Sequence, residues 1–282
     1  MLPRRRTLLL AVTAASALCS ACSKLGTSPS GGGGSNAVFI ADPDSRFVGD
    51  LPAPLAVNGV TYVYVNTQSD GTQVQGSSDG VTFTQMPANY PAGVARSIVA
   101  LPDQRYRMYY FATDTSTDMV SAVSSDGRTW TREAGLRFTR PNTGAVLKVH
   151  TLPAGGFRLY YPDGSNHNAA TSSDGLTFTT EGPITLPLPD ATSTWGSSSV
   201  IFANGQFQMV MPKFLQGTNP VLWHAVSIDA KTWTVDSHEL AMNPGVSLTQ
   251  PAWTVNSTTN RVYYRAQGST GPGVIASGIV RF

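Results

Sequence analysis

The amino-acid sequence predicts an all-β protein built from repeated four-stranded units, and three observations carry this prediction. A turn motif of the form Ser-Ser-Asp-Gly-x-Thr-aromatic-Thr occurs four times with little variation. An alternating strand pattern rich in aromatic and apolar residues precedes every copy. Apolar residues at helical spacing are absent over any useful length after residue 22. Repetition of this kind is typical of proteins that place one structural unit beside another many times.

The four turn motifs align without gaps, and their Asp residues lie 47, 48 and 55 residues apart. In such a turn the Asp carboxylate accepts bonds from the backbone amides that follow it, and Gly adopts a positive φ. The Thr-aromatic-Thr tail alternates as a strand does, so the aromatic ring is expected in the core. We therefore predict structural turns, and no ligand role, for Asp79, Asp126, Asp174 and Asp229.

Each turn motif completes a unit of four short strands. Two alternating apolar runs come first, followed by one strand before the turn and one after it. The second strands, mostly rich in Tyr, cover residues 62–64, 106–110, 157–161, 207–211 and 261–264. Four antiparallel strands in about 45 to 50 residues have the size of one propeller blade. Five copies therefore predict a five-bladed β-propeller of four-stranded antiparallel blades over residues 37–282.

The fifth unit stops at Phe282 before its fourth strand. A strand-like run at residues 37–41 precedes the first blade and has no partner of its own. We predict that this run pairs with the last blade and closes the ring, because closure removes an open sheet edge that would promote aggregation.

The first 22 residues have the pattern of an export signal. A basic start at residues 4–6 is followed by an apolar run at residues 8–19, which is too short for the roughly 20 residues of a membrane span. The following Ser20-Ala21-Cys22 resembles a bacterial lipobox, although Cys19 stands where that motif usually has Leu. The resemblance implies a signal peptide at residues 1–21 and lipidation of Cys22. An ordinary signal cleaved after Ala21 is the alternative, and the export route stays open between the general and the twin-arginine pathway.

A Gly/Ser-rich tract fills the chain between Cys22 and the first predicted strand. Such a tract buries no apolar surface and behaves as a flexible tether, so residues 22–36 are predicted to link a lipid anchor to the propeller. The predicted location is the bacterial cell envelope, at the outer membrane or the cell surface.

Composition excludes several kinds of function. Without the three leader arginines the formal charge is 16 − 17 = −1, so nucleic acid is not expected as a partner. Both cysteines lie in the leader, which leaves the propeller no thiol for a disulfide, a metal site or a nucleophile. The four His show no spacing typical of metal ligands. We expect a monomer with no metal and no cofactor.

The repeated units resemble the five-bladed β-propellers of the arabinanase, xylosidase, invertase and levansucrase group of glycoside hydrolases. The turns are similar to the Asp-box of sialidases, which has one more residue between Asp and Gly. The resemblance covers about residues 37–282 and implies a glycan-binding funnel. In active members of this group, two Asp and a Glu line that funnel near the starts of the innermost strands. Glycosidic cleavage needs at least two carboxyl groups, one to protonate the leaving oxygen and one to attack or to activate water.

The corresponding positions carry no carboxylate when the five units are aligned on their second strands. They hold Ala53, Arg96, Leu147 or Lys148, Ser198 or Ser199, and Gln250. The three Glu, at positions 133, 181 and 239, follow the fourth strands and are expected on the outer rim. Asp50 and Asp163 remain as catalytic candidates, and Asp163 also fits a turn in Pro162-Asp163-Gly164.

We therefore predict a glycosidase-like scaffold whose funnel binds a glycan or another small polar ligand, without the usual catalytic carboxylates. Arg96 is expected to face solvent at the mouth of an innermost strand. The alternatives are an active exported glycoside hydrolase that uses Asp residues and a protein-binding envelope scaffold. The predicted ligand contacts are Arg96, Lys148, Trp195, Lys213, Gln250 and Arg265.

Overall fold

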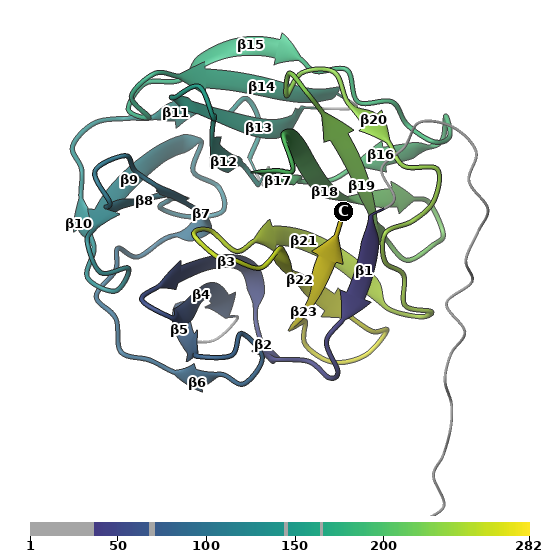
Figure 1. The fold of residues 1–282 in the computed structure, drawn as a ribbon, viewed down its shortest axis with the longest axis horizontal. Coiled ribbons are helices and arrows are strands. Elements are labelled where there is room, and N and C mark those ends of the chain that lie inside the picture. The colour runs from purple at the N-terminus through teal and green to yellow at the C-terminus, as the bar shows by residue number, and fades with distance from the viewer. Residues whose placement is uncertain (1–36, 68–70, 144–145, 164–165) are drawn as a thin grey trace, which may run out of the picture. The chain divides into compact units, whose positions relative to one another are not determined.

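The computed structural model describes residues 37–67, 71–143, 146–163 and 166–282. The predicted signal peptide, the predicted lipidation site Cys22 and the whole predicted tether lie outside these residues. Within them the protein consists of strands, turns and loops, without a helix, and so no helix there could cross a membrane. The strands form five antiparallel sheets arranged as blades around a common centre (Figure 1).

The blades follow one another along the chain, each running from its innermost to its outermost strand. Blade 1 contains β3 (Asp50–Val57), β4 (Val60–Thr67), β5 (Gly71–Ser77) and β6 (Thr84–Gln85). Blade 2 contains β7 (Val94–Ala100), β8 (Tyr106–Phe111), β9 (Asp118–Ser124), and the two short outer pieces β10 (Thr131–Arg132) and β11 (Phe138–Thr139). Blade 3 contains β12 (Lys148–Thr151), β13 (Phe157–Asp163), β14 (Asn166–Ser172) and β15 (Thr179–Pro183).

Blades 4 and 5 each contain one strand that is broken in two. In blade 4 the innermost strand consists of β16 (Ser193–Trp195) and β17 (Ser199–Ala203), followed by β18 (Gln206–Leu215), β19 (Val221–Ser227) and β20 (Thr234–Val235). Blade 5 contains β21 (Ser247–Trp253), β22 (Arg261–Gln267) and β23 (Val274–Arg281), with β1 (Val38–Ala41) and β2 (Phe47–Val48) as its outer edge. The five-bladed, four-stranded architecture predicted from the repeats is confirmed.

The ring is closed by the N-terminal strand, as predicted. β1 pairs antiparallel with β23, from Val38 opposite Arg281 to Ala41 opposite Gly278. Figure 1 shows the purple β1 lying beside the yellow β23, which joins the two ends of the propeller in one sheet. Ala37 and the ring of Phe39 also enter the apolar cluster between blades 4 and 5.

The core is divided into five apolar clusters, and each one lies between two neighbouring blades. The cluster between blades 1 and 2, for example, joins Leu55 and Tyr64 to Met108 and Trp130. Four similar clusters join the other neighbouring pairs, including blade 5 with blade 1. Every blade therefore buries both of its faces against its neighbours, and the hydrophobic stabilisation depends on a complete ring.

The Asp residues of the repeated turns accept hydrogen bonds from the backbone of their own turns. Oδ1 of Asp126 accepts the N–H groups of Arg128 and Thr129, at 2.8 and 2.7 Å, and the hydroxyl of Ser124 at 2.9 Å. The same pattern of backbone N–H and Ser hydroxyl donors occurs in the other three turns. Desolvation acts to raise the pKa of Asp126, but the hydrogen-bond donors together outweigh it. The same donors stabilise the ionised carboxylate in both turns and hold the pKa of Asp126 and of Asp229 at about 2.

A Tyr hydroxyl from the preceding blade fixes each of these turns. Tyr64 of blade 1 donates to the carbonyl oxygen of Gly127 in the blade 2 turn, at 2.5 Å. Tyr109, Tyr160 and Tyr263 reach the turns of blades 3, 4 and 1 in the same way. The ring of each Tyr also meets the aromatic residue of the turn motif edge to face. The Tyr-rich strand and the Asp turn therefore form one interlocking contact between neighbouring blades.

The turns give stability a defined pH dependence. All four Asp have pKa values below the ordinary 3.8 because of their backbone and Ser donors. A carboxylate whose pKa is lowered by folding contributes stability that is complete above its unfolded pKa and is lost as the pH falls. We expect the unfolding temperature to fall between about pH 4 and pH 2. In a variant with Asn at all four positions the slope over this range should be shallower, and an unchanged slope would assign acid sensitivity to other groups.

Candidate functional site

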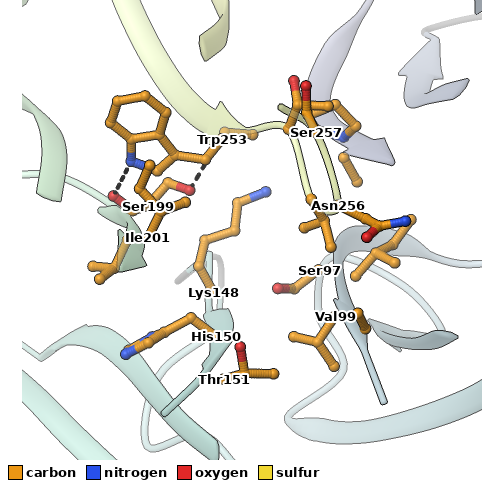
Figure 2. A pocket seen from close by; sticks show the side chains of 18 of the residues that line it. Ser97, Val99, Lys148, His150, Thr151, Ser199, Ile201, Trp253, Asn256 and Ser257 are labelled. Carbon is orange, nitrogen blue, oxygen red and sulfur yellow. Dashed lines mark hydrogen bonds between the residues drawn. The ribbon is translucent and has the colours of Figure 1, made fainter. Parts of the chain in front are cut away.

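A cavity of about 290 Å³ lies at the centre of the ring, at the end where the innermost strands finish. Strands β3, β7, β12, β17 and β21 all contribute side chains to this axial cavity, together with the loop that follows β21. The lining is largely neutral, with hydroxyl and amide groups from Ser97, Thr151, Ser199, Asn256 and Ser257 among aliphatic side chains (Figure 2). No carboxylate is present among the described residues that line it.

Hydrogen bonds between innermost strands hold the cavity wall in place. The Ser97 hydroxyl donates to the carbonyl oxygen of Val149 and accepts the Val149 N–H, which ties β7 to β12. On the opposite side the backbone N–H of Trp253 donates to Ser199 Oγ at 3.1 Å, and its indole Nε1 donates to the Ser199 carbonyl (Figure 2). Ser97 and Ser199 each form hydrogen bonds between neighbouring blades, so the cavity wall is already ordered before any ligand binds.

Lys148 supplies the only cationic side chain among the described residues of the lining. It begins β12, is 6% exposed, and extends its ammonium group between Ser199 and Trp253 on one side and Ser97 and Asn256 on the other (Figure 2). Nζ donates to the carbonyl oxygens of Pro52 and Arg96, each at 3.1 Å. Burial disfavours the charged form and lowers the pKa of Lys148 to about 8.

His150 is the other titratable residue of the lining and stays neutral. Its imidazole stacks on the ring of Tyr160 with centroids 5.1 Å apart, and it is buried. Burial, with a smaller contribution from the nearby Arg158 charge, lowers the pKa of His150 to about 3. The cavity at neutral pH therefore contains one positive charge and no negative one.

The mouth of the axial cavity carries an exposed aromatic ring. Phe202, near the end of β17, is 46% exposed and rests edge to face on Phe207 with centroids 5.0 Å apart. A second hollow of about 300 Å³ adjoins the first, and the two share Thr254, Asn256, Ser257 and Thr259. An aromatic face beside hydroxyl and amide groups matches the apolar faces and hydroxyl edges of a sugar.

The six predicted ligand contacts do not form one site. Of the six, only Lys148 lines the axial cavity. Arg96 is 1% exposed, so the expectation that its side chain faces solvent is wrong. Its guanidinium lies near the Tyr90 ring, 5.6 Å from the centroid, and donates to Asn66 Oδ1 and to the Pro91 carbonyl, at 3.4 and 3.3 Å. Burial lowers the pKa of Arg96 to about 10.

Gln250 and Arg265 belong to a cluster near the starts of the innermost strands of blades 1 and 5. Gln250 Oε1 accepts the backbone N–H of Leu51 at 2.7 Å, and Arg265 forms an ion pair with Asp50. Asp50 is the only carboxylate on the innermost strands of the described residues. Glycosidic cleavage by the usual route needs a pair of carboxyl groups, and Asp50 has no second carboxylate on these strands to act with.

Trp195 and Lys213 face one another across β16 and β18 in blade 4. Lys213 pairs with Asp190 at 3.3 Å and lies over the ring of Trp223, while the Trp195 indole donates to the Pro187 carbonyl at 3.3 Å. Trp195 is buried. Whether these residues bind a ligand stays a prediction.

The remaining acidic residues occupy separate places. Asp163 ends β13 and accepts a bond from Asn142 Nδ2 at 2.6 Å. Glu133 directly follows β10 and Glu181 lies on β15, and they pair with Arg107 and Arg158, each at 2.8 Å. The described residues contain no group of three or more acidic, His or Cys side chains that could hold a metal ion.

Two contributors to the cavity were not singled out from the sequence. One is Phe202, and the other is the polar loop 254–260 that follows β21. This loop has seven residues, whereas the corresponding connection in blade 1 has only Asn58 and Gly59. The length difference is the sequence signal that marks the loop as a candidate for ligand contact.

No model of a known protein family matches the sequence, and no curated protein matches it either. Solved structures do resemble the fold. The native arabinanase Arb43A of Bacillus subtilis superposes with a TM-score of 0.61 at 14% identity, over 85% of this chain and 96% of the arabinanase. A GH43 endo-arabinanase of Bacillus licheniformis gives 0.60 at 13% identity, over 86% and 96%. The GH43 protein BlXynB of the same species, as its K247S mutant, gives 0.65 at 8% identity, over 86% and 55%.

At these identities the comparisons establish a shared fold and leave the activity open. The chain is a five-bladed β-propeller with its structural neighbours among the arabinanases and xylosidases of glycoside hydrolase family 43, as the repeated strands and turns of the sequence predict.

Proposed function

We propose that this propeller binds a glycan without hydrolysing it, and that the axial cavity is its binding site. The observation that carries the proposal is the pairing of an exposed aromatic ring, Phe202, with a neutral hydroxyl and amide lining that contains no carboxylate. Glycosidic cleavage by the usual route needs two carboxyl groups about 5 to 10 Å apart across the scissile bond. Among the described residues, the innermost strands carry one carboxylate, that of Asp50, and it forms an ion pair with Arg265.

The structural neighbours support a carbohydrate ligand, because several of them are described as arabinanases or glycoside hydrolases. The axial cavity lies where the innermost strands finish, whereas the carboxylates of active family members are expected near the starts of these strands, so the neighbours support the class of ligand and not the position of the site. The fold alone fits many ligands, so the argument depends on the cavity lining.

Phe202 gives the first test. We expect Phe202→Ala to weaken the glycan bound by the full chain about tenfold, because the change removes the stacking surface and about 1.4 kcal/mol of binding free energy. Phe214→Ala is the matched control, since Phe214 is a similarly exposed ring of the same blade on β18, outside the lining of the axial cavity. The glycan is first identified on an array and then titrated by calorimetry.

The same titration separates the competing functions. Loss of affinity in the Phe214 variant and not in the Phe202 variant would move the site away from the axial cavity. Release of reducing ends from the bound glycan, abolished by Asp50→Asn, would establish the hydrolase instead. Failure of every glycan on the array to bind would leave the protein-binding scaffold as the better explanation.

The proposal includes export and a lipid anchor at Cys22, supported by the leader and the Gly/Ser-rich tract of the sequence. A tethered propeller could hold glycan close to the envelope while its binding site remains free to reorient. We expect Cys22→Ala to move the protein from the membrane fraction to the soluble fraction of cells, because a lipid chain no longer attaches to it. Fractionation identical to the parent would contradict the anchor.

A further inference from the structure

The charge inside the ring of innermost strands is unbalanced. Of the described residues, β3 carries Asp50, β7 carries Arg96, and β12 carries Lys148 with the neutral His150. The innermost strands β16, β17 and β21 carry no titratable side chain. Since Asp50 already pairs with Arg265, no carboxylate remains on these strands to neutralise Lys148.

Lys148 has hydrogen-bonding capacity left over. An ammonium group has three N–H donors, and the two partners found for Nζ are both neutral carbonyl oxygens, of Pro52 and Arg96. No ion pair of the described residues includes Lys148. The group is 94% buried, so water compensates its charge poorly. A buried cation of this kind is most stable when an anion completes its surroundings.

We propose that the axial cavity binds the carboxylate of an acidic sugar, with Lys148 Nζ as the cation that recognises it. This inference rests on the proposed glycan-binding function and specifies its ligand class. The lining favours a carboxylate over a phosphate, because one ammonium group among neutral Ser and Asn side chains matches a single negative charge. A phosphate would bring a charge of nearly two, and the cavity offers no second cation to meet it.

The size of the cavity sets the length of ligand that enters. At about 290 Å³ it lies at the lower limit of small-molecule pockets, which suits one sugar ring. The neighbouring hollow of about 300 Å³ continues from Asn256 and Thr259 and extends the site for further sugar units. The carboxylate would therefore belong to the sugar that is deepest in the site, with Phe202 stacking near the mouth.

The hydrogen bond between Lys148 and the ligand carboxylate should be stronger than an ordinary one, because the lysine is already desolvated. Folding has removed Lys148 from water, so only the ligand carboxylate loses hydration when the two meet. Charge-assisted hydrogen bonds are roughly twice as strong as neutral ones, and the low dielectric of the interior strengthens them further. The pKa of Lys148 should rise again from about 8 when the carboxylate is bound.

The test compares oligomers of galacturonic acid and of glucuronic acid with the same oligomers after reduction of their carboxyl groups. The reduced forms keep their rings and carry a neutral hydroxymethyl group in place of each carboxylate, so the two forms differ only at that group. We expect the full chain to bind at least one acidic oligomer ten or more times more tightly than its reduced form in calorimetry. The free monomeric acids form a further arm, and equally tight binding of a monomer would identify a small carboxylate as the ligand.

Lys148→Met should abolish the preference for the acidic oligomer and leave affinity for the reduced form within about threefold, because Met fills similar space without charge. Lys231→Met is the control, since Lys231 pairs with Glu181 and lies outside the axial cavity. Its preference should equal that of the parent.

A second measurement covers the case in which Lys148→Met does not fold. The protonated lysine binds the carboxylate, so the affinity of the parent for the acidic oligomer should fall up to about tenfold per pH unit above pH 8, while the reduced oligomer shows no such fall. Equal binding of both forms by the parent would overturn the acidic-sugar inference and retain the glycan-binding function. Binding of no oligomer or monomer here, nor of any glycan on the array, would overturn both.

Discussion

Deleting residues 37–41 is expected to lower the unfolding temperature of the full chain by about 10 °C or more and to cause aggregation. The deletion removes β1, which supplies the outer edge of blade 5 and places Phe39 in the cluster between blades 4 and 5. For a domain of this size 1 kcal/mol corresponds to about 2–4 °C, and a strand with its buried side chains contributes several kcal/mol. The exposed β23 would then be free to pair with other molecules. Thermal melting and light scattering together measure the two effects.

A single substitution tests the same contact without shortening the chain. A Cβ atom on Gly278 would lie 2.7 Å from the carbonyl oxygen of Ile40 and would overlap the ring of Phe39. Gly278→Val should therefore displace β1 and reproduce much of the effect of the deletion. Gly268→Val is the control, because a Cβ atom there has nothing closer than 3.9 Å and the backbone needs no positive φ. A deletion variant that melts like the parent would show that β1 contributes little to closing the ring.

The sequence predicts the architecture because every blade repeats the same local chemistry. The Asp turns and the Tyr-rich strands recur at matching positions, and the structure joins them directly, as Tyr64 and the blade 2 turn show. The junction of blades 4 and 5 lacks this contact between a Tyr and an Asp turn, and the sequence explains why. Blade 4 has Val210 where the other blades have this Tyr, and blade 5, its neighbour, has no Asp turn to receive one. Phe282 packs on Trp253 at this junction instead.

The candidate site is harder to predict, because alignment of repeats gives the height of a residue on its strand and not the direction of its side chain. Strand pairing in blades 1, 2 and 5 shifts register near the start of the innermost strand, and Leu51, Ala95 and Gln250 adopt positive φ there. Such an irregularity redirects the side chains that follow it. Arg96 comes directly after Ala95 and turns toward Tyr90 rather than toward solvent. Phe202 stands at a repeated strand position, where the strand pattern does not mark a ligand contact, and the loop 254–260 differs from the corresponding connection of blade 1 by its length.

Tyr64→Phe is expected to destabilise the propeller by about 2–6 kcal/mol, more than the same change at the equivalent Tyr263. The Tyr64 hydroxyl donates to the buried Gly127 carbonyl and accepts the Trp130 indole N–H at 2.7 Å, so its loss leaves two buried polar groups without a partner. Each such group costs about 1–3 kcal/mol.

Tyr263 is the matched control because its hydroxyl donates to the Gly80 carbonyl, while the aromatic residue of that turn is Phe83, which has no N–H to offer. Both substitutions keep the ring and its edge-to-face contact, so the difference between them isolates the indole hydrogen bond. Chemical denaturation of the two variants and the parent measures the free energies of unfolding. Equal losses would mean that the Trp130 indole finds another partner when Tyr64 is replaced. A loss in neither variant would mean that the apolar clusters, rather than these hydroxyls, hold neighbouring blades together.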